Sequence, residues 1–368
     1  MNRKIYLDYA AATPMDKEVL RAMEPYFSDK FHNPSASYLA AKDARRALEQ
    51  ARAKVAGCLG ARPAEIVFTA GATEANNLAI QGVMRGRPDG EVLVSAIEHE
   101  SVLEPAKLFK HRLIPVTGEG LIDLAKLEKM ITPKTVLVSI GLVNNELGTL
   151  QPLGKIAKIL DKSGVLLHSD AAQAPSYIDL QVSRLGVDML SINGGKIYGP
   201  KQSGALYMRV GVKLQPLIVG GGQEFGLRSG TENTAGVIGL AAALKKAQLS
   251  SKQEARRVSG LRELFILELT KKTAVVVNGS RRHSAPHILS VIFPGQDNER
   301  LMMELDEAGV QAATGSACSA SSREPSHVLS AIGLSDEQAR STLRFSLGRQ
   351  TTDADINKAI ELLSKLTK

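Results

Sequence analysis

Short apolar runs alternate with amphipathic stretches along most of the chain. The runs that predict strands lie at 65–70, 91–96, 113–116, 135–141, 165–170, 188–193 and 204–209. Stretches with helical spacing follow some of them, one from about Thr73 and another over 101–111. Several runs are apolar on both faces, as in a parallel sheet covered on both sides. The pattern therefore predicts an α/β fold with a mostly parallel sheet and helices on both faces.

The last third of the chain has a different order of elements. A long helical region at 234–272 is followed by a strand at 288–293, a helix at 297–308, a strand at 341–347 and a terminal helix. A chain of 368 residues can bury one large core and one smaller core. We therefore expect a large domain at 16–255, a small α/β domain at 256–368, and an N-terminal segment at 1–15 that packs with the small domain.

Composition narrows the classes of function. The net charge of +8 and the pI of about 9.3 favour anionic ligands. Basic residues form no dense block and aromatic residues are only 4% of the chain, so we expect no nucleic-acid binding. Two cysteines exclude a disulfide scaffold. The start lacks a signal-peptide pattern and no apolar run is long enough for a membrane span, so we expect a cytoplasmic protein.

Two motifs follow predicted strands directly. In TAGATEANN (69–77), Gly71 allows a tight turn, and Ala72 and Thr73 open a helix whose N-terminus can bind a phosphate. An ordinary helix cap explains Thr73 equally well. In HSDAAQAP (168–175), Asp170 ends an apolar strand, where open α/β sheets bind ligands. Its carboxylate can pair with a protonated ring nitrogen of a cofactor, or it can simply begin a turn.

Two basic residues stand in unusual surroundings. Lys196, in SINGGKIYGPKQSG (191–204), lies among small residues between two apolar strands. A desolvated lysine is an amine nucleophile suited to a Schiff base, whereas a solvated lysine in a glycine-rich turn is the alternative. Arg344 lies in the apolar strand of STLRFSLGR (341–349). Its guanidinium can hold a substrate carboxylate at two points or form a surface ion pair.

Two further segments contain candidate functional residues. The glycine-rich run 220–233 contains Arg228 and Thr231, candidates for a phosphate contact or an interface. Cys318 is flanked only by glycine, serine and alanine, so we expect a mobile loop with an available thiol. Cys58 lies in a helical pattern and fits a structural role.

The order and spacing of the motifs resemble one family. LDYAAATP, EIVFTAGATEANNLAI, IEHESVL, LVNNELGT, HSDAAQ, GGKIYGPK, RSGTEN, GSACSASSREPSHVL and RFSLGR resemble the cysteine desulfurases of the NifS/IscS type. These are fold-type I pyridoxal-phosphate enzymes of the class-V aminotransferase superfamily. The resemblance covers about residues 5–360. It implies a mostly parallel seven-stranded sheet with helices on both faces and a smaller C-terminal α/β domain.

The resemblance also implies roles for residues at matching positions. It implies a homodimer that uses pyridoxal 5'-phosphate to convert L-cysteine to L-alanine, with the sulfur leaving as a persulfide on Cys318. The acceptor of that sulfur would be a protein such as an iron–sulfur scaffold or a tRNA-thiolation protein. The implied roles are Lys196 for the Schiff base, Asp170 for the ring nitrogen, Gln173 for the ring hydroxyl, His99 for the ring face and proton transfer, Ala72, Thr73 and the partner's Thr231 for the phosphate, and Asn145 and Arg344 for the substrate carboxylate.

The chain departs from the family pattern before the lysine. The family usually has Ser-Gly-His-Lys, whereas this chain has Asn193, Gly194 and Gly195 before Lys196. The family's serine and histidine donate to the phosphate. Asn193 can still donate through its amide, but Gly195 has only its backbone N–H. We expect weaker cofactor binding, by about 1–3 kcal/mol. Phe225 also replaces the usual arginine after Gln-Glu.

Other functions remain open at this point. A related pyridoxal-phosphate lyase or aminotransferase needs the lysine and aspartate but no loop cysteine, so Cys318 favours the desulfurase. A selenocysteine lyase is a second enzyme alternative. A catalytically weak homologue that acts as a sulfur-relay scaffold or regulatory partner is an alternative from another class, and Gly195 is its only support.

Overall fold

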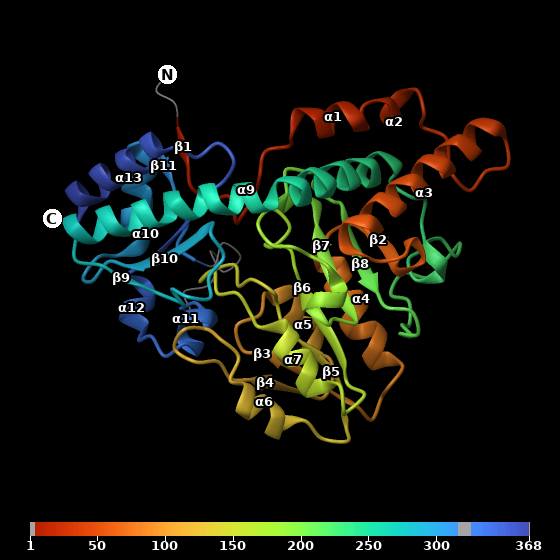
Figure 1. Cartoon of the computed structure of the whole chain (residues 1–368), viewed down its shortest axis with the longest axis horizontal. Helices are drawn as coiled ribbons and strands as arrows, with labels where there is room; N and C mark the ends of the chain where they lie inside the picture. The colour runs from red at the N-terminus through yellow and green to blue at the C-terminus, as the bar shows by residue number, and fades with distance from the viewer. Residues whose placement is uncertain (1–3, 316–324, 368) are drawn as a thin grey trace.

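A seven-stranded sheet forms the centre of the molecule (Figure 1). The computed structural model describes residues 4–315 and 325–367. In spatial order the strands are β2 (Ile66–Thr69), β8 (Gly204–Met208), β7 (Met189–Asn193), β6 (Leu166–Asp170), β5 (Thr135–Ser139), β3 (Glu91–Ser95) and β4 (His111–Ile114). The pairs from β7 to β4 are parallel, and β8 runs antiparallel to both of its neighbours. The predicted mostly parallel sheet is confirmed.

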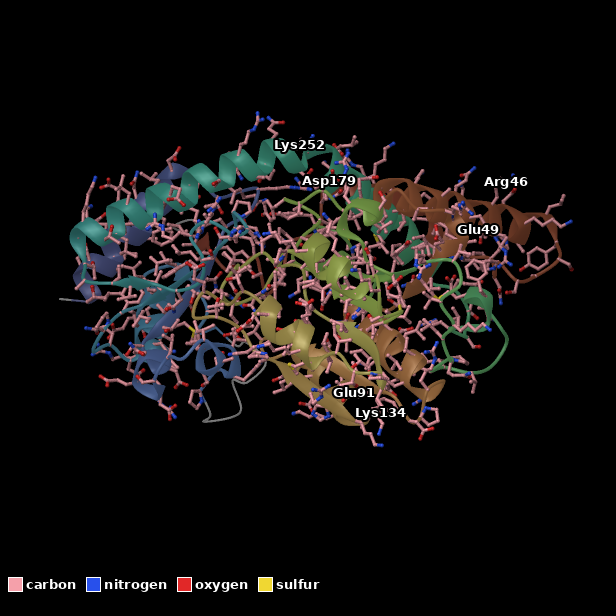
Figure 2. The ribbon with its side chains drawn as sticks, turned by 60° about the horizontal axis from the view of Figure 1, so that its bottom comes forward. Arg46, Glu49, Glu91, Lys134, Asp179 and Lys252 are labelled. Carbon is pink, nitrogen blue, oxygen red and sulfur yellow. The ribbon has the colours of Figure 1, made fainter. Side chains whose placement is uncertain are left out.

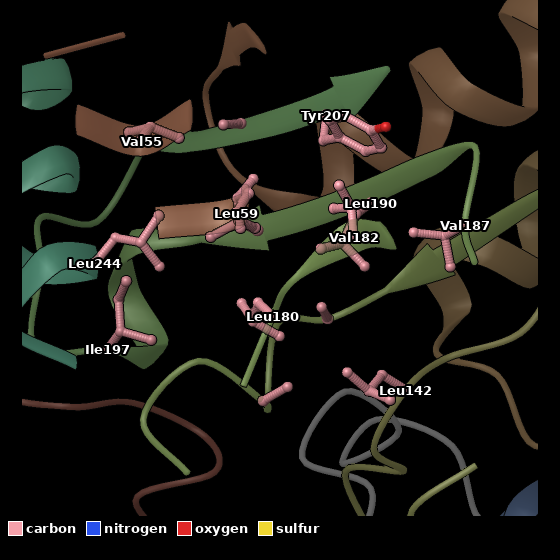
Figure 3. Close-up of a cluster of buried hydrophobic side chains, with 14 of the residues drawn as sticks. Val55, Leu59, Leu142, Leu180, Val182, Val187, Leu190, Ile197, Tyr207 and Leu244 are labelled. Atoms are coloured by element: carbon pink, nitrogen blue, oxygen red, sulfur yellow. The ribbon is translucent and has the colours of Figure 1, made fainter. Parts of the chain in front are cut away.

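Helices cover both faces of this sheet. Those from the first half of the chain are α1 (Lys17–Met23), α2 (Pro25–Ser28), α3 (Leu39–Leu59), α4 (Ala72–Arg85), α5 (Glu100–Lys107), α6 (Leu124–Met130), α7 (Leu153–Leu160) and α8 (Val182–Leu185). On one face, Leu78 of α4 packs in a cluster with Val92 and Leu137. On the other face, α3 contributes Leu59 to a cluster that includes Leu190 (Figure 3). Successive residues of the strands therefore point into different cores, which explains their continuous apolar runs.

The long helix α9 (Thr234–Lys272) runs from the central sheet to a second, smaller sheet (Figure 1). Its first half packs Leu244 into the core that contains α3, and its second half packs Phe265 against Phe345 in a separate core. The smaller sheet is antiparallel, in the order β12 (Thr342–Ser346), β10 (Ile288–Ile292) and β9 (Val276–Val277). The elements around it are α10 (Asn298–Glu307), α11 (His327–Ala331), α12 (Asp336–Arg340) and α13 (Asp353–Leu366).

The N-terminal segment crosses to the smaller sheet's side of the molecule. Strand β1 (Ile5–Tyr6) pairs in parallel with β11 (Val310–Gln311), and Asp8 forms a bridge with Ser346. The separate apolar core around the smaller sheet and this crossing are compatible with the expected division at 15 and 255, and those boundaries remain a prediction.

The strand expected at 113–116 is placed wrongly by the sequence pattern. Strand β4 begins at His111 and ends at Ile114, because Pro115 has no N–H to continue the ladder. The preceding helix was expected to extend to 111 but ends at Lys107. The error arises because β4 is an edge strand whose first residues are polar and partly exposed.

Charged side chains lie mainly at the periphery of the molecule, as the labelled residues of Figure 2 illustrate. Several of them form ion pairs between close neighbours in sequence, such as Arg46 with Asp43. In the part of the chain that the structure describes, no helix is both long and apolar enough to cross a membrane.

Candidate active site

Nine of the residues singled out in the sequence meet at a cavity of about 130 Å³. Asp170 is the last residue of β6 and Asn193 is the last residue of β7, so the cavity lies at the carboxyl ends of the central strands. The candidate residues that line it are Ala72, Thr73, His99, Asn145, Asp170, Gln173, Asn193, Lys196 and Arg344. Residues from six separate motifs of the sequence are therefore brought to one place.

Hydrogen bonds to both oxygens orient the Asp170 carboxylate. Its Oδ1 accepts from the backbone N–H of Ala172 at 2.8 Å, and its Oδ2 accepts from the side chain of Asn76 at 2.7 Å. The carboxylate therefore has a fixed orientation at the cavity wall, as a partner for a cationic ring nitrogen requires.

A short 3₁₀ turn, Gly194–Lys196, delivers the lysine to the cavity. Asn193 starts the turn, since its Oδ1 accepts from the backbone N–H of Gly195 at 3.1 Å. Lys196 Nζ donates to the carbonyl oxygens of Ala10 and Ala11, at 2.8 and 2.6 Å. The N-terminal segment thus holds the amine at the cavity, where it is positioned to react with a carbonyl group.

The turn between β2 and α4 has the backbone of an anion site. Gly71 has a φ of +138°, which favours glycine, and α4 begins immediately after it at Ala72. Thr69 Oγ1 donates to the carbonyl oxygen of Gly71 at 2.9 Å and tightens the turn. The first N–H groups of α4 have no carbonyl partners within the helix and can bind a phosphate.

The glycine-rich segment 220–233 packs against strand β2, which precedes this turn, and stabilises it. Glu224 accepts from the backbone N–H of Phe68 in β2 and pairs with Arg52 of α3, with its oxygens 2.7 and 2.8 Å from the guanidinium nitrogens. Both charged side chains are 3% exposed. The Arg52 guanidinium lies 4.7 Å from the ring centre of Phe68 and 5.1 Å from that of Phe225. Phe225 therefore has a packing role where the family usually has an arginine.

A second ion pair stabilises the first turn of α4. Glu74 Oε1 pairs with Arg228 Nε at 3.0 Å, and Glu74 Oε2 accepts from the backbone N–H of Ala70 at 2.8 Å. Arg228, a candidate phosphate contact from the sequence, thus binds a carboxylate that supports the anion site.

Arg344 reaches the cavity from the smaller sheet. One guanidinium nitrogen pairs with Asp8 Oδ1 at 2.8 Å, and another donates to the carbonyl oxygen of Asn145 at 3.0 Å. Its Nε is buried without a hydrogen-bond partner among the described residues. The surface ion pair considered from the sequence is excluded, because the side chain is buried. A guanidinium with unused hydrogen-bonding capacity at a cavity can bind a carboxylate.

Gln173 is oriented by the N-terminal segment and by a buried histidine. Its Nε2 donates to the carbonyl oxygen of Ala10 at 2.9 Å, and its Oε1 lies 3.5 Å from His287 Nε2. The His287 ring stacks on Tyr177 with 4.2 Å between ring centres. Burial lowers the pKa of His287 to about 3, so this ring is neutral.

His99 lines the cavity and also caps a helix. Its Nδ1 accepts from the backbone N–H of Ser101 at 3.0 Å and lies 2.9 Å from Ser101 Oγ. The ring is therefore fixed to the first turn of α5.

The aminotransferase class-V family model matches residues 5–359, nearly the whole chain. The chain belongs to the class-V aminotransferase family. The cysteine desulfurase IscS of Dictyoglomus turgidum is 43% identical, with 100% of this chain and 95% of the relative covered. The cysteine desulfurase IscS 1 of Archaeoglobus fulgidus is also 43% identical, with 97% and 95% covered. These findings confirm the resemblance drawn from the motifs.

Solved structures agree with this family assignment. A NifS-like protein superposes with a TM-score of 0.93 at 33% identity, with 99% of each chain covered. A NifS-like protein from Rickettsia africae superposes with a TM-score of 0.91 at 31% identity, again with 99% of each chain covered. The fold of this class-V aminotransferase is therefore the fold-type I arrangement expected from the sequence.

Two buried carboxyl groups at the cavity were missed by sequence reasoning. Burial raises the pKa of Glu98 to about 8, helped by the charge of Asp170 and opposed by the N–H of Gly141, which donates to Glu98 Oε1 at 2.8 Å. Burial also raises the pKa of Glu146, opposed by Ser326, whose Oγ donates to it at 2.6 Å. Both residues lie in quoted motifs, IEHESVL and LVNNELGT, but their burial has no local signal in the sequence.

The structure places Thr231 and Cys58 away from the residues that line the cavity. Thr231 is exposed and is not among the described residues that line it. Cys318 lies outside the described residues. Cys58 is half-buried in α3, and burial raises the pKa of its thiol. Within residues 4–315 and 325–367, no cluster of histidine, cysteine and carboxylate side chains could hold a metal ion.

Proposed function

We propose that this class-V aminotransferase is a cysteine desulfurase, which converts L-cysteine to L-alanine and passes the sulfur to an acceptor. Pyridoxal 5'-phosphate is its cofactor. The observation that carries the proposal is the meeting of Lys196, Asp170 and Arg344 at one cavity in a chain that is 43% identical to cysteine desulfurases over nearly its full length.

The cavity residues fit this cofactor. The Lys196 amine supplies the covalent attachment, and the oriented Asp170 carboxylate suits the ring nitrogen. The N-terminus of α4, with Ala72 and Thr73, suits the phosphate. Gln173 suits the ring hydroxyl. Bound there, the cofactor supplies an electron-withdrawing ring that stabilises negative charge on the carbon bound to the substrate nitrogen.

The protein's own groups would bind and orient the substrate. Arg344 and Asn145 would hold the cysteine carboxylate, with Asp8 keeping the guanidinium in place. Fixing the carboxylate and the amino group together leaves the substrate thiol as the group that moves toward a nucleophile.

Cys318 would receive the sulfur. Its thiolate would attack the substrate sulfur while the carbon–sulfur bond breaks. The former sulfur-bearing carbon gains a hydrogen, so one cysteine and one enzyme thiol give one alanine and one enzyme persulfide. We infer this role from the sequence, because the residue lies outside the described part of the chain.

The proposed function also involves a partner subunit and a sulfur acceptor. A homodimer would let the partner's Thr231 complete the phosphate site, and the exposed position of Thr231 in its own chain supports this. A sulfur acceptor for iron–sulfur cluster assembly would take the persulfide sulfur, and a tRNA-thiolation protein is the alternative. We also propose a cytoplasmic location, where a persulfide relay can be reset by reducing thiols.

Product analysis tests the function against its alternatives. The holoenzyme with L-cysteine should yield alanine, whereas an elimination lyase yields pyruvate and ammonia. Lys196→Ala should lose both the visible absorbance of attached cofactor and the product. Pyruvate as the main product would reject the desulfurase, and unchanged absorbance in the variant would reject Lys196. No cofactor and no product in the wild-type protein would favour the scaffold alternative.

A further inference from the structure

Asn76 lies on α4 and joins two groups that line the cavity. Its side chain is fully buried, and its Nδ2 donates to Asp170 Oδ2 at 2.7 Å and to Ser101 Oγ at 2.8 Å. Both hydrogens of the amide nitrogen are therefore used. Its Oδ1 is buried and has no hydrogen-bond partner among the described residues. Because the Asn76 oxygen makes no such bond, the two bonds from its nitrogen, to Asp170 and Ser101, orient the amide.

The contact with Asp170 fixes which end of the Asn76 amide is the nitrogen. The opposite orientation would place the amide oxygen 2.7 Å from a carboxylate oxygen, with no hydrogen between them. The amide nitrogen therefore faces both Asp170 and Ser101, and Ser101 Oγ must accept a hydrogen from it.

This arrangement determines the tautomer of His99. The backbone N–H of Ser101 donates to His99 Nδ1 at 3.0 Å, which leaves no place for a hydrogen on Nδ1. The 2.9 Å contact between Ser101 Oγ and Nδ1 is then a bond in which the hydroxyl donates. The only lone pair of the neutral ring is thus engaged by two donors, and the ring hydrogen lies on Nε2.

We propose that Asn76 is a positioning residue that ties Asp170 and His99 into one network, and that this network presents His99 as an N–H donor at Nε2 rather than as a base. His99 then orients and stabilises a group in the cavity by donating a hydrogen bond. Proton abstraction falls to another group, and the Lys196 amine lies at the same cavity. The identity of the group that faces His99 rests on the proposed function, whereas the tautomer of His99 does not.

The tautomer is measurable without turnover. Nitrogen-15 NMR of the holoenzyme with labelled histidine separates protonated from unprotonated ring nitrogens, and His99→Gln identifies the signals of His99. We expect an unprotonated Nδ1 and a protonated Nε2. A hydrogen on Nδ1, or a ring that exchanges between tautomers, overturns the proposal.

Matched variants test the positioning role. Asn76→Ala should lower kcat by about 10- to 100-fold, leave KM within about twofold, and change the absorbance of the bound cofactor. Asn77→Ala is the control, because this neighbouring side chain donates to Thr73 O of its own helix at 2.9 Å. It should match the wild type. Unchanged kcat and absorbance in Asn76→Ala overturn the proposal.

A second pair of variants covers the case in which Asn76→Ala does not fold. Ser101→Ala should lower kcat, and Ser101→Thr, which keeps the hydroxyl, should restore most of it. Equal activity of the two variants overturns the link from Asn76 to His99. A holoenzyme with the expected tautomer that makes no alanine would reject the proposed function and leave the network intact.

Discussion

Glu98 should make the folded protein less stable as the pH rises. Its side chain is buried at the cavity and its pKa is raised from 4.5 to about 8. Between these values the folded state binds a proton that the unfolded state has released, so the free energy of unfolding falls as pH rises. The difference of about 3.5 pKa units corresponds to about 5 kcal/mol at most, reached above pH 8.

Glu98→Gln removes this loss while keeping the local contacts. The glutamine oxygen can still accept from the N–H of Gly141, and the amide, like the protonated carboxyl, carries no charge. We therefore expect the variant to match the wild type near pH 5 and to become more stable than it by several kcal/mol near pH 8. Glu100→Gln, at an exposed neighbouring position, should show no such divergence.

Urea unfolding of the cofactor-free protein, followed by circular dichroism from about pH 5 to about pH 9, measures the effect. Parallel stability curves for wild type and Glu98→Gln would refute the raised pKa. Below pH 8 a neutral Glu98 adds no second negative charge beside Asp170.

Two other predictions concern the phosphate site. Gly195→His should slow cofactor dissociation about tenfold, because a histidine adds a charge-assisted donor and a Cβ at this position would lie an ordinary 3.6 Å from its nearest atoms. Unchanged or faster loss of the cofactor, measured by absorbance after gel filtration, would contradict this. Arg52→Met should lower the free energy of unfolding in urea by about 3–5 kcal/mol, because it leaves Glu224 buried without its partner. The double variant Arg52→Met with Glu224→Gln should recover much of that loss. An equally unstable double variant would contradict the stabilising role of the Arg52–Glu224 pair.

The sequence predicts the central sheet well because its strands are apolar on both faces and are separated by helical spacing. Edge strand β4 is misplaced, since its polar residues carry no such pattern. The site is predictable where a motif follows a strand directly, as at Asp170 and Lys196. Asn76 and Arg52 are different, because their partners lie 94 and 172 residues away and only the folded chain shows them.

The glutamates at the cavity show a further limit of the sequence. Glu98 and Glu146 are charged residues in loops, and such residues are usually solvated. Contacts with distant segments accompany this burial. Ser326 donates to the Glu146 carboxylate, and His327 Nε2 donates to the backbone carbonyl oxygen of Glu98 at 2.9 Å. These contacts join segments about 180 and 229 residues apart, so no local pattern predicts them.

The most direct test of the desulfurase is to locate the sulfur after a single turnover. The holoenzyme is mixed with one equivalent of L-cysteine, alanine is quantified, and the peptides are examined by mass spectrometry. We expect one alanine for each added sulfur atom on the peptide that contains Cys318, the same result with Cys58→Ser, and neither product with Cys318→Ser, which should keep its cofactor. Alanine and sulfur release at an undiminished rate in Cys318→Ser would contradict the account.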